Sequence, residues 1–119
     1  SVGFHLRHVA GSIDRLLAYA RGEALTGEQR AALAAEKEPG APRADAAELV
    51  RGAQRAIATA IDTMRAMPRE KLLEPRGVGR AQLPSTVLGL LFHIAEHTQR
   101  HTGQVITTAK IVRASGRAS

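Results

Sequence analysis

The sequence has no cysteine and no tryptophan, and only one tyrosine and two phenylalanines among its 119 residues. Without cysteine, disulfide bonds, thiolate metal sites and a cysteine nucleophile are all excluded. The shortage of aromatic side chains argues against nucleic-acid binding by base stacking, which needs aromatic platforms. The net charge of +6 is carried mainly by arginines spread along the chain without a dense basic block, so we expect no nucleic-acid partner.

Long apolar runs are also missing. No stretch approaches the ~20 apolar residues that span a membrane, and the first residues lack the pattern of a signal peptide. We therefore expect a cytoplasmic protein without a membrane partner. A chain of 119 residues has room for one domain and not two, so we expect residues 1–119 to form a single helical domain.

Apolar residues recur at helical spacing along most of the chain, whereas no segment has the alternation that is typical of a strand. Three long helices and one shorter helix are predicted, over residues 2–21, 46–67 and 85–114 for the long ones and 27–36 for the short one. The predicted fold class is all-α, an antiparallel bundle of the four-helix type. Three long helices do not close such a bundle, so we expect a further helix before residue 1 or a second chain, in a homodimer, to complete it.

Each long helix has an apolar face that we expect to be buried. In the first helix this face consists of Leu6, Val9, Ile13, Leu16, Leu17 and Ala20. In the second long helix it consists of Leu49, Ala53, Ile57, Ala60, Ile61 and Met64. In the last helix it consists of Val87, Leu90, Ile94, Val105, Thr108 and Val112.

Local signals set the predicted boundaries of the helices. Thr26 and Gln29 have the spacing of a capping box at the start of the short helix. Proline and glycine residues predict a loop over residues 74–83. Pro84 is predicted to lie in the first turn of the last helix, where its missing N–H group costs nothing.

Three histidines follow one another at intervals of four residues in the last helix, at His93, His97 and His101. Side chains four residues apart lie one above another on a single helix face. His97 and His101 interrupt the apolar stripe of this helix, where a core helix carries leucine or isoleucine. Two imidazoles in a core need a compensating partner, and a divalent metal is the obvious one. The alternative is a histidine pair that is exposed or bonded to backbone carbonyls.

A second pair of histidines, His5 and His8, lies in the first helix. A metal site built across a bundle takes its ligands from facing helices, so one of this pair would join His97 and His101. Three protein nitrogens leave an open coordination position, which is typical of catalytic metals. Zinc and nickel both suit imidazole ligands. Helical phase alone favours His5, which lies closer than His8 to the apolar stripe.

Two short motifs lie at opposite ends of the chain, Leu6-x-x-His8-Val9-x-x-Ser12 and His97-x-x-x-His101-x-Gly103-Gln104. Together they resemble the DinB-like superfamily of metal-binding four-helix bundles, and the resemblance covers most of the chain. It implies that the metal ligands are His8, His97 and His101. Members of this family usually have a further helix before the first histidine, which implies that the chain is N-terminally incomplete.

Four other residues near the ligands are candidates to line a pocket or to orient a ligand, namely His5, His93, Gln104 and Ser12. A role for His93 as a fourth ligand is disfavoured, because three histidines at successive intervals of four span ~12 Å along the helix axis. No carboxylate is predicted beside the ligands, so the sequence provides no general base.

The resemblance implies a metal-dependent transferase that acts on a small-molecule substrate through a low-molecular-weight bacterial thiol. Hydrolysis is the close alternative, because a metal with an open position lowers the pKa of a bound water as well as that of a bound thiol. A second hypothesis is a non-catalytic, metal-stabilised helical module that binds a partner or dimerises. A helix-turn-helix DNA-binding domain is disfavoured, because no short basic helix follows a tight turn.

Overall fold

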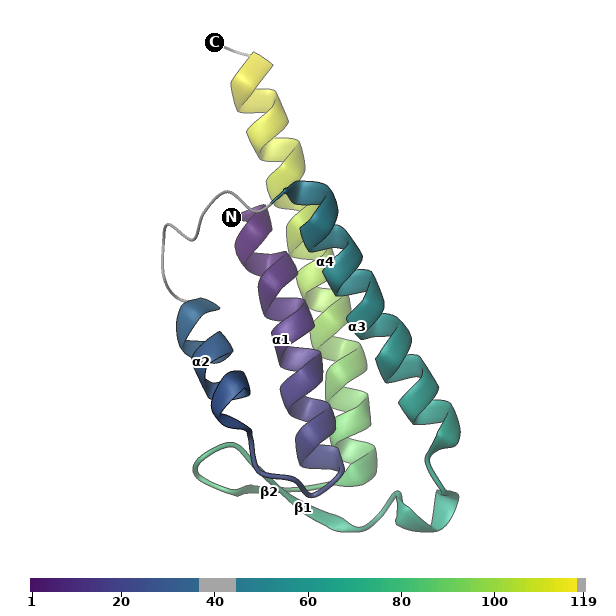
Figure 1. Cartoon of the computed structure of the whole chain (residues 1–119). Helices are drawn as coiled ribbons and strands as arrows, with labels where there is room; N and C mark the ends of the chain where they lie inside the picture. The colour runs from purple at the N-terminus through teal and green to yellow at the C-terminus, as the bar shows by residue number, and fades with distance from the viewer. Residues whose placement is uncertain (37–44, 118–119) are drawn as a thin grey trace.

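The computed structural model of the protein describes residues 1–36 and 45–117, which form a helical bundle with a small β-hairpin at one end (Figure 1). The predicted all-α bundle is confirmed, because three long helices and one short helix make up most of the described chain. The helices α1 and α3 run in one direction and α2 and α4 in the other. Their bounds are Val2–Ala20 for α1, Gly27–Glu36 for α2, Ala46–Ala66 for α3 and Val87–Arg117 for α4.

The segment before α4 differs from the prediction. A short 3-10 helix, Arg69–Lys71, leads into two antiparallel strands, β1 at Pro75–Val78 and β2 at Leu83–Thr86. The predicted loop over residues 74–83 was therefore wrong, and α4 begins at Val87, slightly later than the predicted start at about residue 85. Pro84 lies within β2 and not in the first turn of α4. Strands of four residues are too short to show alternation, and a two-stranded hairpin has only edge strands, which tolerate proline.

The hairpin is fixed to the end of α1 by one arginine. The Nε group of Arg76 donates a hydrogen bond to the backbone carbonyl of Ala20 at 2.9 Å. The same guanidinium forms an ion pair with Glu74, also at 2.9 Å. Because the carbonyls in the last turn of a helix have no partner within the helix, Arg76 satisfies one of them and holds the hairpin against the bundle.

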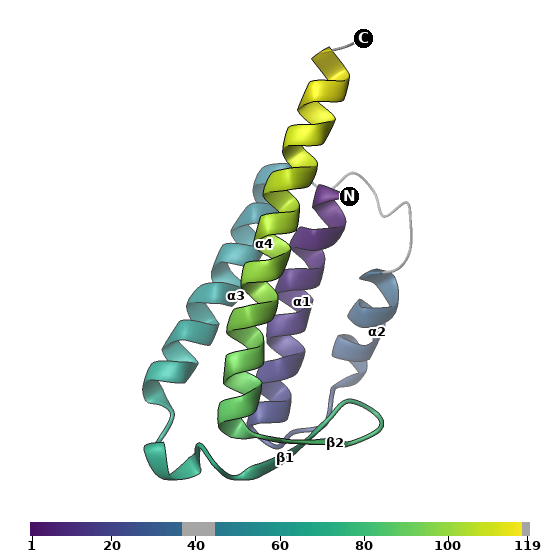
Figure 2. The ribbon, with the colours of Figure 1, turned by 180° about the vertical axis from the view of Figure 1, so that it is seen from behind.

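The hydrophobic core lies along α1, which is flanked by α3 and α4 (Figure 2). Ile13 of α1 and the α4 residues Val87 and Leu90 are the largest fully buried side chains of the described residues. The buried residues of α3 are small, Ala53 and Ala60. They allow the backbone of α3 to approach α1 closely.

Two residues of the predicted apolar faces are exposed. Ile61 of α3 is 42% exposed and Val112 of α4 is 61% exposed. The position of Val112 has a simple cause, because the last turns of α4 project beyond the end of the other helices (Figure 2). Helical periodicity identifies an apolar face, but it does not show where the neighbouring helices end.

The short helix α2 buries a charged side chain and no large apolar one. The predicted capping box is confirmed, since Gln29 N–H donates to Thr26 Oγ1 at 3.1 Å and Thr26 N–H donates to Gln29 Oε1 at 2.9 Å. The one buried residue of α2 is a carboxylate, Glu36. Polar contacts therefore contribute much of the attachment of α2 to the bundle.

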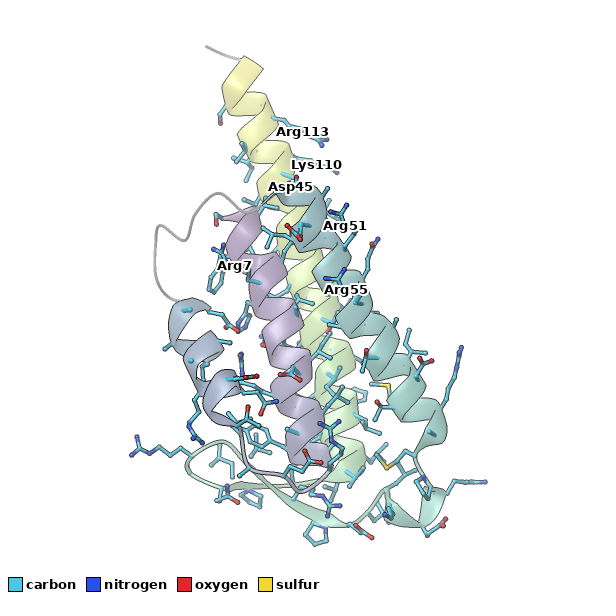
Figure 3. All side chains as sticks on the ribbon, in the orientation of Figure 1. Arg7, Asp45, Arg51, Arg55, Lys110 and Arg113 are labelled. Carbon is cyan, nitrogen blue, oxygen red and sulfur yellow. The ribbon has the colours of Figure 1, made fainter. Side chains whose placement is uncertain are left out.

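The outer surface carries most of the charge. Among the described residues, no helix is both long and apolar enough to cross a membrane. Basic side chains from three helices lie toward the end of the bundle at which α1 begins, namely Arg7, Arg51, Arg55, Lys110 and Arg113 (Figure 3).

Candidate metal centre

The helices α1 and α4 lie side by side in opposite directions and bring histidines from the two ends of the chain together. One ring nitrogen from each of His8, His97 and His101 lies within 4.8 Å of the other two. The Nε2 atoms of His8 and His97 are 3.3 Å apart. Two nitrogens bound to one tetrahedral zinc at about 2.0–2.1 Å are separated by about 3.3 Å. The three imidazoles could therefore hold a metal ion.

The protonation state of the cluster suits metal binding. Burial, followed by the neighbouring His101 and His8, lowers the pKa of His97 from 6.5 to about 4. Burial also lowers the pKa of His101, and His8 and His5 add to this effect. Because both pKa values are lowered, His97 and His101 are neutral at neutral pH. A neutral imidazole keeps the nitrogen lone pair that a metal ligand needs.

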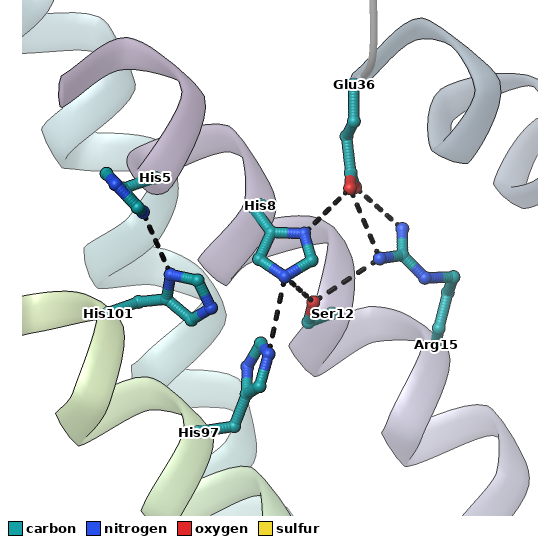
Figure 4. A network of polar contacts seen from close by, with 7 residues as sticks. All are labelled: His5, His8, Ser12, Arg15, Glu36, His97 and His101. Carbon is teal, nitrogen blue, oxygen red and sulfur yellow. Dashed lines mark hydrogen bonds and ion pairs between the residues drawn. The ribbon is translucent and has the colours of Figure 1, made fainter. Parts of the chain in front are cut away.

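A carboxylate that the sequence did not predict orients His8 (Figure 4). Nδ1 of His8 donates a hydrogen bond to Oε2 of Glu36, the last residue of α2, at 2.9 Å. Because an ionised carboxylate only accepts hydrogen bonds, this contact places the proton on Nδ1 and leaves Nε2 of His8 free to face His97. The expectation that no carboxylate lies beside the histidines was wrong. A carboxylate on the outer nitrogen of a histidine is typical of metal sites.

The side chain of Glu36 is 8% exposed and is held by a second charge. Nη1 of Arg15 donates to Oε1 of Glu36 at 2.7 Å, and Nη2 donates to Ser12 Oγ at 3.3 Å. Gly11 leaves room for this arrangement, because a Cβ atom at that position would overlap Glu36 Oε1. A glycine inside a helix is destabilising relative to alanine, so its presence there often has a packing reason. His8, Gly11 and Arg15 lie on one side of α1 and all three contact or make room for Glu36. This series of a histidine, a glycine and an arginine is the sequence signal that could have indicated a buried acidic partner.

His5 also reaches the cluster, but through a different contact. Its Nδ1 lies 2.9 Å from Nδ1 of His101. One of these two nitrogens carries the hydrogen and the other accepts it. The group of three converging nitrogens contains His8, whereas His5 bonds to the outer side of His101 (Figure 4).

The other predicted pocket residues differ in their positions. Ser12 is buried, and its Oγ lies 3.4 Å from Nε2 of His8. His93 is exposed and stacks on His97 with ring centroids 5.6 Å apart. A hollow of about 130 Å³ lies between Ser12, His93 and His97. Gln104 lies on the exposed surface of α4, and its role stays a prediction.

Comparison with known families identifies the family of the chain. The family profile described as the DinB superfamily matches residues 1–105 of the chain. The chain belongs to the DinB superfamily. No curated protein and no solved structure gave a match. The matched region of this DinB superfamily protein includes all five histidines, and therefore the whole cluster lies within it.

Proposed function

We propose that this DinB superfamily protein is a metal-dependent enzyme in which His8, His97 and His101 hold a divalent metal, zinc or nickel. The observation that supports the proposal is the convergence of three ring nitrogens within 4.8 Å. The donor set fits such a metal, because neutral imidazole binds both zinc and nickel well. The lowered pKa values of His97 and His101 reduce the competition between protons and the metal.

The surrounding residues would prepare this centre for catalysis. Glu36 fixes the tautomer and the orientation of His8, and Arg15 holds that carboxylate in place. Three protein ligands leave a position open for an outside ligand. A divalent metal bound there supplies a Lewis acid that lowers the pKa of a water or thiol ligand.

The reaction we propose is the transfer of a low-molecular-weight thiol to or from a small-molecule substrate. The chain has no cysteine, so any thiol used at this centre must come from outside the chain. Hydrolysis, with water in the place of the thiol, is the second reaction that the same centre would support. Ser12 and His93 line the hollow beside His97 and would contact a ligand seated there.

Metal analysis tests the proposal. We expect about one equivalent of zinc or nickel per chain in the purified protein, measured by elemental analysis after dialysis. The variant His97→Ala should lose most of this metal. His93→Ala is the matched control, because His93 lies on the same helix outside the group of three nitrogens, and it should keep the metal. Equal metal content in both variants would contradict the proposal.

Activity is tested separately. Metal-loaded protein is incubated with a panel of small thiols and electrophiles, and also with esters in the absence of thiol. We expect turnover that His97→Ala abolishes. Thiol-dependent turnover supports the transferase, and thiol-independent turnover supports the hydrolase.

A non-catalytic, metal-stabilised module that dimerises is the alternative function. It is favoured by large apolar side chains exposed on α4, where Leu88, Phe92 and Ile106 are 47%, 73% and 51% exposed. This alternative requires a dimer in light scattering that Phe92→Ser converts to a monomer. A monomer that turns over substrate excludes it.

A further inference from the structure

A second and larger hollow lies below the histidine cluster, between the end of α1, the helix α2 and the tip of the hairpin. Its volume is about 890 Å³, which falls within the ~300–1,000 Å³ range of small-molecule sites. Side chains from α1, α2 and the loop between them form an apolar wall, made of Tyr19, Leu25 and Leu33. Such a wall can pack against a ring or an alkyl chain.

The charged groups of this hollow are mainly cationic. Arg30 of α2 and Arg80 of the hairpin turn both line it. Nη1 of Arg30 donates to the carbonyl of Leu25 at 2.7 Å, which holds the guanidinium at the wall. Neither arginine forms an ion pair within residues 1–36 and 45–117. The one carboxylate in the lining, Glu23, is already paired with Arg21 at 3.0 Å.

The two hollows meet at one side chain. Tyr19 lines the large hollow and also the small one that contains His93 and His97. Residues 12, 15, 16 and 19 of α1 line the small hollow, and of these Tyr19 also lines the large one. A molecule seated in the large hollow could therefore extend past Tyr19 toward the histidine cluster.

We propose that the large hollow, called here the arginine pocket, binds an anionic small molecule with an apolar body. The apolar body would pack on Tyr19 and Leu33, and the anionic group would pair with Arg30 and Arg80. Guanidinium groups bind carboxylates and phosphates through strong charge-assisted hydrogen bonds. The further statement that this molecule is the substrate or the thiol of the enzyme rests on the proposed function.

Two fluorescent probes that share the anilinonaphthalene body separate the two parts of this recognition. Anilinonaphthalene sulfonate carries an anionic group, and phenylnaphthylamine is its neutral counterpart. Both are titrated into the full chain and followed by their fluorescence. We expect the sulfonate to bind at least about tenfold more tightly than the neutral probe, which corresponds to one charge-assisted contact.

Variants then locate the binding site. The double variant Arg30→Gln with Arg80→Gln should weaken binding of the sulfonate about tenfold and leave that of the neutral probe within about twofold. The matched double variant Arg69→Gln with Arg113→Gln removes the same net charge from exposed positions outside the pocket and should change neither. Leu33→Ser should weaken both probes. Circular dichroism checks that each variant is folded.

Each other result overturns the proposal. It is wrong if the sulfonate does not bind, if both probes bind equally well, or if the two double variants weaken the sulfonate equally. It is also wrong if Leu33→Ser leaves both probes unaffected, because the probes then bind elsewhere, for example at the exposed Phe92.

The proposal of the arginine pocket and the proposal of the metal centre can be refuted independently. His97→Ala should lose metal and keep full binding of the sulfonate. If the arginine pocket passes these tests but the chain binds no metal, the pocket is supported and the proposed function is refuted. In metal-loaded, active protein the sulfonate should inhibit turnover competitively with the substrate, and non-competitive inhibition would refute the assignment of the pocket to the substrate.

Discussion

Oε2 of Glu36 lies 2.9 Å from Nδ1 of His8, although the two residues are 28 positions apart in the sequence. The contact joins the end of α2 to the centre of the proposed metal site. Because Glu36 is the buried residue of α2, the same side chain attaches this helix and orients a ligand. Metal binding and the docking of α2 should therefore be coupled, each stabilising the other.

Replacing Glu36 by glutamine should weaken metal binding. Glutamine still accepts a hydrogen bond from His8, but it lacks the charge that makes the imidazole a better ligand and leaves Arg15 without its counter-ion. We expect zinc affinity, measured by competition with a chelating dye, to fall about 10- to 100-fold. The control is Glu28→Gln, an exposed change on the same helix. Equal affinities in the two variants would show that Glu36 has only a structural role.

The glycine beside Glu36 provides an independent test. Gly11→Ala would place a methyl group where Glu36 Oε1 lies, so we expect a loss of about 1–3 kcal/mol in the free energy of unfolding together with weaker zinc binding. Gly52→Ala in α3 is the matched control, because its Cβ would meet only the flexible end of Arg55 at 3.9 Å. That change should raise the free energy of unfolding by about 0.5–1 kcal/mol through helix propensity. Chemical denaturation measures both, and stabilisation by Gly11→Ala would contradict the placement of Glu36.

The metal-free protein should lose stability in mildly acidic solution. The pKa of His97 is about 4 in the folded state and 6.5 in the unfolded state, so between these pH values the unfolded state binds more protons. The contribution of His97 to stability is therefore complete above about pH 6.5 and falls as the pH decreases toward 4. The lowered pKa values of His5 and His101 act in the same direction.

Urea denaturation in the presence of a chelator measures this pH dependence. His97→Gln is the control, because it removes the titrating group and should give a flatter decline over the same interval. A decline in His97→Gln as steep as in the parent chain would mean that other groups, such as the carboxylates, dominate acid unfolding.

The histidine cluster was predictable from the sequence because it depends on regular spacing. Residues 97 and 101 share a helix face by their interval of four, and antiparallel packing of the first and last helices brings residue 8 to them. Helical periodicity alone favoured His5, and the family motif favoured His8. The structure brings both to the cluster, with His8 in the group of three and His5 behind His101.

Other parts of the site and fold could not be predicted in this way. Glu36 ends a short helix with little apolar periodicity, and its contact with Arg15 depends on how α2 lies on α1. The hairpin was missed because each strand has only four residues and Pro84 is equally compatible with a helix start. In both cases the deciding interaction is a tertiary contact that leaves no repeated pattern in the sequence.

The two N-terminal histidines should contribute unequally to metal binding. His8→Ala removes a proposed ligand together with its hydrogen bond to Glu36, so we expect zinc affinity to fall at least about 100-fold. His5→Ala removes the hydrogen bond to the outer nitrogen of His101 but no proposed ligand, so we expect a fall of about tenfold or less. A cobalt spectrum of each variant distinguishes a lost ligand from a reoriented one, because coordination number controls the intensity of the visible bands. The opposite result, in which His5→Ala abolishes zinc binding and His8→Ala retains it, would contradict this prediction. The ligand would then be His5, as helical phase favours, and not His8, as the family motif favours. The contact between Glu36 and His8 would then serve only to hold α2 against the bundle.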